Sequence, residues 1–228
     1  MIRSARHGGC SLYYMNSNIH YELLRTQAAK FRAAGIELTP ALAGAIVAYS
    51  QLLLRWNRKI NLTTITDPQE ILRRNFVESF YGARWLADPS GTLCDVGSGA
   101  GFPGLALKLV RPGWSVRLFE PNLKKAAFLA EVARQLHLAD VEVLRQRWQE
   151  SEIALHSIDT VTVRAVGGYE AIANRAQNVL KPTGRLLLWL GAVEAEIVSR
   201  GSAWKWQTES LPDSRERVLL VGMPTSGR

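Results

Sequence analysis

The chain of 228 residues carries a formal net charge of +8, a sequence pI near 9.8 and 47% hydrophobic residues, which suits one α/β core with a modest helical addition. No apolar run approaches the ~20 residues of a membrane span and no apolar signal core follows Arg3 and Arg6, so we expect a cytoplasmic protein with no membrane partner. The positive charge favours an anionic partner such as nucleic acid, with simple solubility as the alternative explanation.

Cysteine and histidine usage predicts neither a disulfide framework nor a metal site. Cys10 lies in a polar stretch and Cys94 in an apolar one, far apart in the chain. The histidines lack the spacing of metal ligands. They stand at His7, His20, His137 and His156.

The chain divides into three predicted parts. Residues 1–19 are polar and aperiodic, and we expect a flexible tail. Residues 20–90 have the pattern of a helical extension, and residues 91–228 that of an α/β domain.

Capping signals divide the helical extension into three helices. From residue 20 apolar residues recur at helical spacing, and Gly35 fits the end of the first helix. Thr39 fits the N-cap of a second helix, with Pro40 at its first position. Asp67 fits the cap of a third helix, which should reach about residue 86.

Beyond residue 91, strands alternate with helices, which predicts a mostly parallel sheet covered on both faces. The expected strands are 92–96, 114–119, 141–144, 160–163 and 185–190. A helix is expected after the glycine-rich turn that follows the first strand, with further helices at 122–137 and 169–180 and a turn at 181–184. Two closing strands, 204–209 and 217–221, are separated by a short turn and should pair antiparallel. Together they make a seven-stranded sheet whose last strand is antiparallel.

A glycine-rich turn follows the first predicted strand. Asp95 ends that strand, and Gly97, Gly99 and Gly101 then let the backbone approach a ligand without Cβ clashes. Ligands of such sheets bind at the carboxyl ends of the strands. Glu120 ends the second strand, where a carboxylate can accept both hydroxyl hydrogens of a ribose or, alternatively, cap the next helix. The pattern therefore predicts a nucleoside site.

The stretch GAGFPG at 99–104 also matches the dinucleotide-binding fingerprint, which leaves an NAD-dependent reductase as an alternative. The placement of Asp95 before the glycines and the antiparallel terminal strands are instead typical of methyltransferases. The chain also has no room for a separate substrate domain and no Tyr-x-x-x-Lys pair.

Two further segments end strands on the same edge. Class I methyltransferases contact adenine after the third strand, where Trp148 can flank the purine and the Trp148 and Gln149 backbone can read its edge; alternatively, Trp148 packs against the sheet. Arg164 follows the fourth strand and can bind a methionine carboxylate or an RNA phosphate, with a surface ion pair as the alternative.

These motifs resemble the RsmG family, the bacterial 16S rRNA guanine-N7 methyltransferases also called glucose-inhibited division protein B. The matching stretches are WNRKINLT at 56–63, DVGSGAGFPG at 95–104, residues 124–129, VRA at 163–165 and KPTG at 181–184. WNRKINLT is the most discriminating, because it lies outside the generic cofactor fold.

The resemblance implies a class I methyltransferase (Rossmann-like) fold and S-adenosyl-L-methionine as cofactor. It implies 16S rRNA or a small-subunit assembly intermediate as partner, and indicates no obligate protein partner. The residues implied at the cofactor are Gly97, Phe102, Trp148, Gln149 and Arg164. The chain departs from the family pattern at three places. Asn75 stands where the family commonly has a histidine, and Trp148-Gln149 stands where an alanine-glutamate pair is usual. An aspartate is frequent near the position of Glu120.

Guanine N7 carries a lone pair and no proton, so its methylation needs alignment rather than a general base. We therefore expect no catalytic side chain, with Arg164 as the one candidate. The helical extension at 20–90 is expected to bind RNA phosphates through Arg55, Arg58, Lys59, Arg73 and Arg74, although a solvated face would look the same. Methylation of a small molecule or protein, and a non-catalytic RNA-binding module, remain alternatives.

Overall fold

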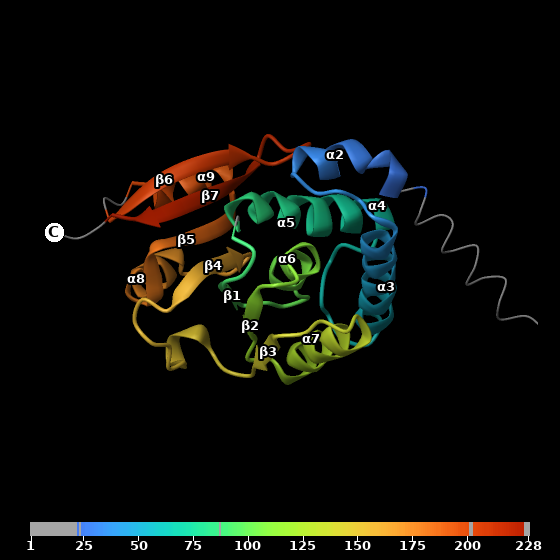
Figure 1. Cartoon of the computed structure of the whole chain (residues 1–228), viewed down its shortest axis with the longest axis horizontal. Coiled ribbons are helices and arrows are strands. Elements are labelled where there is room, and N and C mark those ends of the chain that lie inside the picture. Colours follow the sequence, from blue (N-terminus) through green and yellow to red (C-terminus); the bar gives the residue numbers. More distant parts are fainter. Residues whose placement is uncertain (1–21, 23, 87, 201–202, 226–228) are drawn as a thin grey trace, which may run out of the picture.

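A seven-stranded sheet forms the centre of the computed structural model, in the order β3-β2-β1-β4-β5-β7-β6 (Figure 1). Strands β1 to β5 pair parallel, and β7 lies antiparallel between β5 and β6. The predicted sheet, with its antiparallel last strand, is confirmed. The structure describes residues 22, 24–86, 88–200 and 203–225, so the predicted tail at 1–19 lies outside the described residues.

The strands lie close to their predicted positions, with one difference in β5. They are β1 (Thr92–Val96), β2 (Ser115–Phe119), β3 (Val141–Leu144), β4 (Ile158–Arg164), β5 (Leu180–Gly191), β6 (Trp204–Ser210) and β7 (Arg217–Pro224). The predicted turn at 181–184 is instead an irregular stretch inside β5. Ile158 of β4 pairs with Leu180 and Thr160 with Arg185, so β5 carries extra residues that bulge out of the ladder.

The helices of the α/β part include one that the sequence analysis does not predict. They are α6 (Gly104–Val110), α7 (Leu123–Gln135), α8 (Tyr169–Val179) and α9 (Ala192–Val198), with a short 3-10 helix at Trp148–Glu150. Helix α9 escapes prediction because Val193 and Ile197 are exposed and only Ala195 is buried. Its apolar residues therefore do not mark a buried face.

The N-terminal helices begin at the predicted caps. They are α2 (Ala28–Ala33), α3 (Pro40–Asn57) and a third helix that changes winding, from α4 (Pro68–Glu70) through a π-helix (Ile71–Val77) to α5 (Glu78–Tyr81) and a 3-10 end (Gly82–Trp85). Thr39 Oγ1 accepts from the Leu42 N–H at 3.2 Å, and Asp67 Oδ1 accepts from the Glu70 N–H at 2.9 Å. Both predicted caps are confirmed, whereas the π-helix is not predicted.

These helices share one hydrophobic core with the sheet. In Figure 1, α5 lies beside α6, and α3 lies beside α6 and α7. Phe31, Tyr49 and Phe76 from the N-terminal helices pack in the same cluster as Leu105 and Phe128 from the α/β part. Within the described residues, no helix has the length and apolar character required to cross a bilayer.

Candidate functional site

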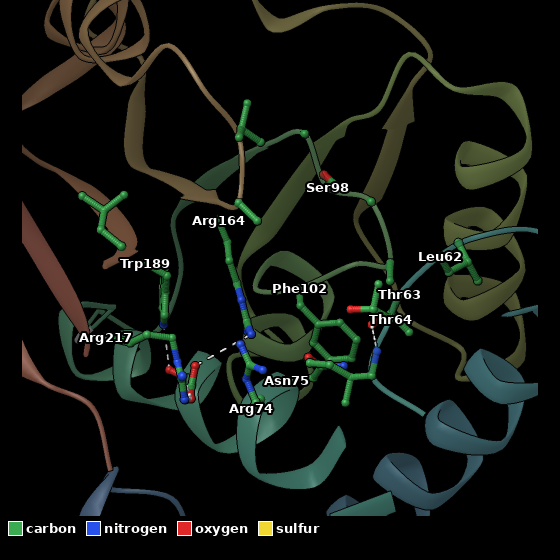
Figure 2. Close-up of a pocket in the computed structure, with 18 of the residues that line it drawn as sticks. Leu62, Thr63, Thr64, Arg74, Asn75, Ser98, Phe102, Arg164, Trp189 and Arg217 are labelled. Carbon is green, nitrogen blue, oxygen red and sulfur yellow. Dashed lines mark hydrogen bonds and ion pairs between the residues drawn. The ribbon is translucent and has the colours of Figure 1, made fainter. Parts of the chain in front are cut away.

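A pocket of about 1230 Å³ opens at the carboxyl ends of β1, β2, β4 and β5. One wall comes from the glycine-rich turn and Glu120, and another comes from residues 61–66 and the π-helix. Figure 2 shows Ser98 of the turn on one side of the pocket and Arg74 and Asn75 of the π-helix on the other. Pockets for one small ligand usually measure roughly 300–1,000 Å³. The pocket therefore has room for a second group beside a nucleoside.

The glycine-rich turn has three residues in the left-handed region. Gly97, Gly99 and Gly101 have φ of +68°, +53° and +85°. Such backbone angles are costly for residues that carry a Cβ. Gly97 and Gly99 line the pocket as predicted, but Gly101 does not. A Cβ at Gly101 would instead overlap the hydroxyl of Tyr49, so its glycine is required by packing against α3.

Tyr49 of α3 supports the turn from behind. Its hydroxyl donates to the Ala100 carbonyl at 2.7 Å, and its ring stacks on Phe102 with centroids 5.0 Å apart. Tyr49 is fully buried, and burial raises the pKa of its hydroxyl well above the usual value, so the group remains a donor. The sequence analysis misses this residue, although a tyrosine on a buried helix face signals a hydroxyl that needs a partner.

Glu120 is fixed by two backbone groups and still faces the pocket. Its Oε2 accepts from the Gly99 N–H at 2.9 Å and its Oε1 from the Asn122 N–H at 2.8 Å. Each carboxylate oxygen keeps a lone pair for a ligand hydroxyl. The side chain of Asn122, rather than that of Glu120, caps α7 by accepting from the backbone N–H groups of Lys124 and Lys125. The helix-cap alternative therefore does not describe Glu120.

Asp95 lies behind the turn, outside the pocket lining. Its side chain is buried, and its Oδ1 accepts from the Thr162 hydroxyl at 2.7 Å, which joins β1 to β4. Burial raises the pKa of Asp95 to about 6, and the bond from Thr162 opposes the rise. Gly104 packs so closely that a Cβ there would lie 2.8 Å from the Asp95 side chain. Asp95 thus supports the turn instead of contacting a ligand directly.

Three residues predicted at the cofactor lie in different environments. Phe102 lines the pocket, and its ring lies beside Asn75 in Figure 2. Trp148 is 1% exposed and packs edge-on against Phe119, with ring centroids 5.3 Å apart. Gln149 is exposed, and neither Trp148 nor Gln149 lines the pocket. The packing alternative therefore describes the Trp148 ring, and the contact of this segment with a purine stays a prediction.

Arg164 reaches across the pocket to a buried carboxylate. Its Nη2 lies 3.8 Å from Oε2 of Glu78, and Arg217 binds Oε1 of the same side chain at 2.7 Å. Burial lowers the pKa of Arg164 to about 10, although Glu78 opposes the fall. Arg164 is therefore not in a surface ion pair. Glu78 and Arg217 were not predicted from the sequence. The available signal was Glu78, because an acidic residue on a helix of buried residues needs a charged partner.

The predicted RNA-binding residues separate into three groups. Arg55, Arg58 and Lys59 are exposed at the end of α3. Arg73 binds Glu70 through two hydrogen bonds of 2.8 and 2.6 Å and does not line the pocket. Arg74 does line the pocket. The five predicted RNA-binding residues therefore lie in three places: three on an outer surface, one in an intrahelical ion pair and one in the pocket.

The WNRKINLT stretch shapes the pocket wall through Asn57. Its Oδ1 accepts from the N–H groups of Leu62 and Thr63 at 2.9 and 3.0 Å, and its Nδ2 donates to the Thr63 carbonyl at 2.9 Å. Trp56 packs against Phe128 of α7, with ring centroids 5.7 Å apart. The stretch thus connects the exposed end of α3 to the loop at 61–66.

Neither metal nor thiol chemistry has support in the part of the chain that the structure describes. There, no three His, Cys, Asp or Glu side chains gather as a metal-binding group. Cys94 is buried in β1, and burial raises the pKa of its thiol to about 12. A protonated, buried thiol is a poor nucleophile.

Comparison with known sequences gives a consistent result. The family model GidB, described as rRNA small subunit methyltransferase G, matches residues 43–215. The Ribosomal RNA small subunit methyltransferase G of Stenotrophomonas maltophilia (strain R551-3) is 38% identical over 173 residues, covering 75% of this chain and 80% of that protein. The protein of the same name from Roseiflexus sp. (strain RS-1) is 38% identical over 202 residues, covering 83% and 86%.

Solved structures agree on the fold. A SAM dependent methyltransferase from Aquifex aeolicus superposes with a TM-score of 0.57 at 18% identity, covering 70% of this chain and 94% of that chain. The ribosomal protein L11 methylase of Lactobacillus delbrueckii subsp. bulgaricus gives 0.57 at 12% identity, covering 66% and 78%. At these identities the likeness shows the class I methyltransferase fold alone.

We expect Asp95→Asn to alter the pH dependence of stability. Burial raises the pKa of Asp95 from 3.8 to about 6, so between these values the folded protein binds a proton that the unfolded chain releases. The wild type should therefore lose stability relative to the variant as pH rises through this window, by about 3 kcal/mol in total, with no further change above it. Urea unfolding of both proteins across roughly pH 4 to 7 measures the difference.

The matched control is Glu152→Gln, which removes one carboxylate at an exposed position. A difference between wild type and Asp95→Asn that stays constant across the pH range would contradict the raised pKa.

Proposed function

Because the chain belongs to the GidB family of rRNA small subunit methyltransferase G, we propose that it transfers a methyl group from S-adenosylmethionine to N7 of a guanine in 16S ribosomal RNA. One observation carries the proposal. One pocket has two different sides. On one side, the glycine-rich turn and the fixed carboxylate of Glu120 suit a nucleoside; on the other, arginine side chains suit RNA.

The residues of the turn fit S-adenosylmethionine. Gly97 and Gly99 bring bare backbone to the pocket, and Glu120 has lone pairs free for the two ribose hydroxyls. When bound, S-adenosylmethionine supplies an electrophilic methyl group on its sulfonium.

The chain's own residues align the reactants and move no proton. Guanine N7 presents its lone pair directly, so the attack needs no general base. Arg164 keeps its charge at neutral pH even with a pKa near 10, so it acts through charge and hydrogen bonding. Phe102 and Asn75 line the pocket side by side and add one apolar and one polar surface to its wall.

RNA approaches over the exposed end of α3. Arg55, Arg58 and Lys59 stand there, and the loop at 61–66 continues from them into the pocket. Phosphate contacts of this kind orient an RNA without reading its sequence. The target base must leave its stack to enter the pocket, so a loop or assembly intermediate of the small subunit suits the site better than a continuous duplex.

A methyl-transfer assay tests the function. The protein is incubated with labelled S-adenosylmethionine and with small-subunit particles, or free 16S RNA, from cells that lack the modification. We expect label on N7 of one guanine, mapped by mass spectrometry of nuclease fragments. Label on protein or on a small metabolite would contradict the RNA assignment, and binding of NADH without methyl transfer would favour the reductase.

Glu120→Ala should weaken binding of S-adenosylhomocysteine at least about tenfold, because two hydrogen bonds to a charged acceptor are lost. Isothermal titration calorimetry measures the change. Glu120→Asp, which keeps the carboxylate, should bind more tightly than Glu120→Ala. Glu142→Ala removes an exposed carboxylate of β3 and serves as the matched control. Equal affinities for wild type and Glu120→Ala would remove Glu120 from the ribose site.

Replacing both Arg58 and Lys59 by alanine should weaken RNA binding and lower its salt dependence. Each lost phosphate contact reduces the slope of log K against log salt by about one. Filter binding at several salt concentrations measures the slope, while the affinity for S-adenosylhomocysteine should not change. Arg134→Ala, at an exposed arginine of α7, controls for the loss of charge. An unchanged slope would show that this surface does not contact RNA.

A further inference from the structure

Four charged side chains meet on the pocket wall opposite the glycine-rich turn. We name Arg74, Arg164, Arg217 and Glu78 the arginine cluster, and all four line the pocket. They come from the π-helix, the end of β4, the start of β7 and the first residue of α5. Figure 2 shows the Arg164 side chain running away from Ser98 of the turn and toward Arg74.

The one carboxylate of this cluster contacts two of its three guanidinium groups. Oε1 of Glu78 accepts from Arg217 Nη2 at 2.7 Å and Nε at 3.2 Å, and Oε2 faces Arg164 at 3.8 Å. The Glu78 side chain is 1% exposed and that of Arg164 15%. The cluster therefore carries two uncompensated positive charges largely out of water, a state that an anion stabilises.

Among the described residues, no other acid forms an ion pair with the cluster, and this includes Glu120 and Glu194, which line the same pocket. Glu70, which feels the charges of Arg74 and Arg217, is bound by Arg73 through both oxygens. Asp95, which feels Arg164, lies behind the turn and accepts from the Thr162 hydroxyl. The balance must come from a ligand or from solvent ions.

Two donors of the cluster are also without an acceptor. Arg74 Nε and Arg164 Nη1 are buried, and neither makes a hydrogen bond within the described part of the chain. Buried donors in folded proteins almost always have a partner, and leaving one unpaired is destabilising. The π-helix that presents Arg74 is itself a rare conformation, frequent at functional sites.

Resting on the proposed function, we infer that the arginine cluster binds a phosphodiester group of the RNA beside the target guanine, rather than the methionine carboxylate of the cofactor. S-adenosylmethionine carries a sulfonium and an ammonium against one carboxylate, so it adds positive charge to the pocket. A phosphodiester brings net negative charge and two oxygens that match the fork of a guanidinium.

Glu78 acts in this subsite as a positioning residue. It holds the guanidinium groups of Arg164 and Arg217, and its own backbone carbonyl accepts from Trp189 Nε1 at 2.8 Å. The 2.7 Å hydrogen bond from Arg217 and the 3.8 Å ion pair with Arg164 orient the two arginines before the RNA enters.

The test uses the full-length protein and unmodified small-subunit particles. We expect Arg74→Gln and Arg217→Gln each to raise the KM for the particles about tenfold, to change kcat little, and to lower the salt slope of particle binding by about one. The calorimetric Kd for S-adenosylhomocysteine should stay within about twofold. That retained binding also shows that the variants are folded. Arg134→Gln removes the same charge from the exposed face of α7 as the control.

Glu78→Gln separates positioning from simple attraction. The substitution adds one positive charge, so attraction alone predicts a lower KM for the particles, whereas loss of positioning predicts a higher KM. A lower KM would overturn the role of Glu78.

Other outcomes decide the subsite itself. Weaker binding of S-adenosylhomocysteine by Arg217→Gln and Arg74→Gln, with unchanged KM for the particles, would assign the cluster to the methionine carboxylate and overturn the inference. No change in either quantity would overturn it as well. A wild-type protein that binds S-adenosylhomocysteine but methylates no RNA would instead overturn the proposed function, and with it the inference.

Discussion

The contact between the Tyr49 hydroxyl and the Ala100 carbonyl connects the two halves of this molecule. It holds α3 so close to the glycine-rich turn that Gly101 has no room for a Cβ. The same approach stacks Tyr49 on Phe102 and brings the loop after α3 to the mouth of the pocket. The N-terminal helices are therefore not an addition to a finished sheet, because they build half of the site.

The pocket combines two different electrostatic environments. On the sheet side, Glu120 offers a carboxylate held by backbone N–H groups. On the helix side, guanidinium groups outnumber the single buried carboxylate of Glu78. An acid beside a ribose and cations beside a phosphate are complementary to a nucleoside cofactor and an RNA substrate, respectively. Because the proposed attack on N7 transfers no proton to the protein, this arrangement has to supply orientation and charge only.

Local sequence signals predicted most of the helices and strands. The features that were not predicted depend on contacts between residues far apart in the chain. The alternation of strand and helix segments predicted the sheet, and the capping residues Thr39 and Asp67 predicted where two helices begin. These features depend on residues that are close together in the sequence. The contact of Glu78 with Arg217 joins positions 139 residues apart, and no local pattern encodes it. For the same reason the sequence left packing and cofactor contact open as alternatives for Trp148, and it did not predict the π-helix at Ile71–Val77.

The π-helix has a consequence for how this pocket wall can arise and be lost. Its backbone bonds span five residues, as from the Glu78 N–H to the Arg73 carbonyl, so each turn holds one residue more than an α-helical turn. Deleting one residue from this segment would restore α-helical winding, while the turns on either side would keep nearly the faces that they present now. The change would fall on the wide turn itself, which carries Arg74 and Asn75 into the pocket wall. Loss of a single codon could thus remodel this wall without turning the rest of the helix.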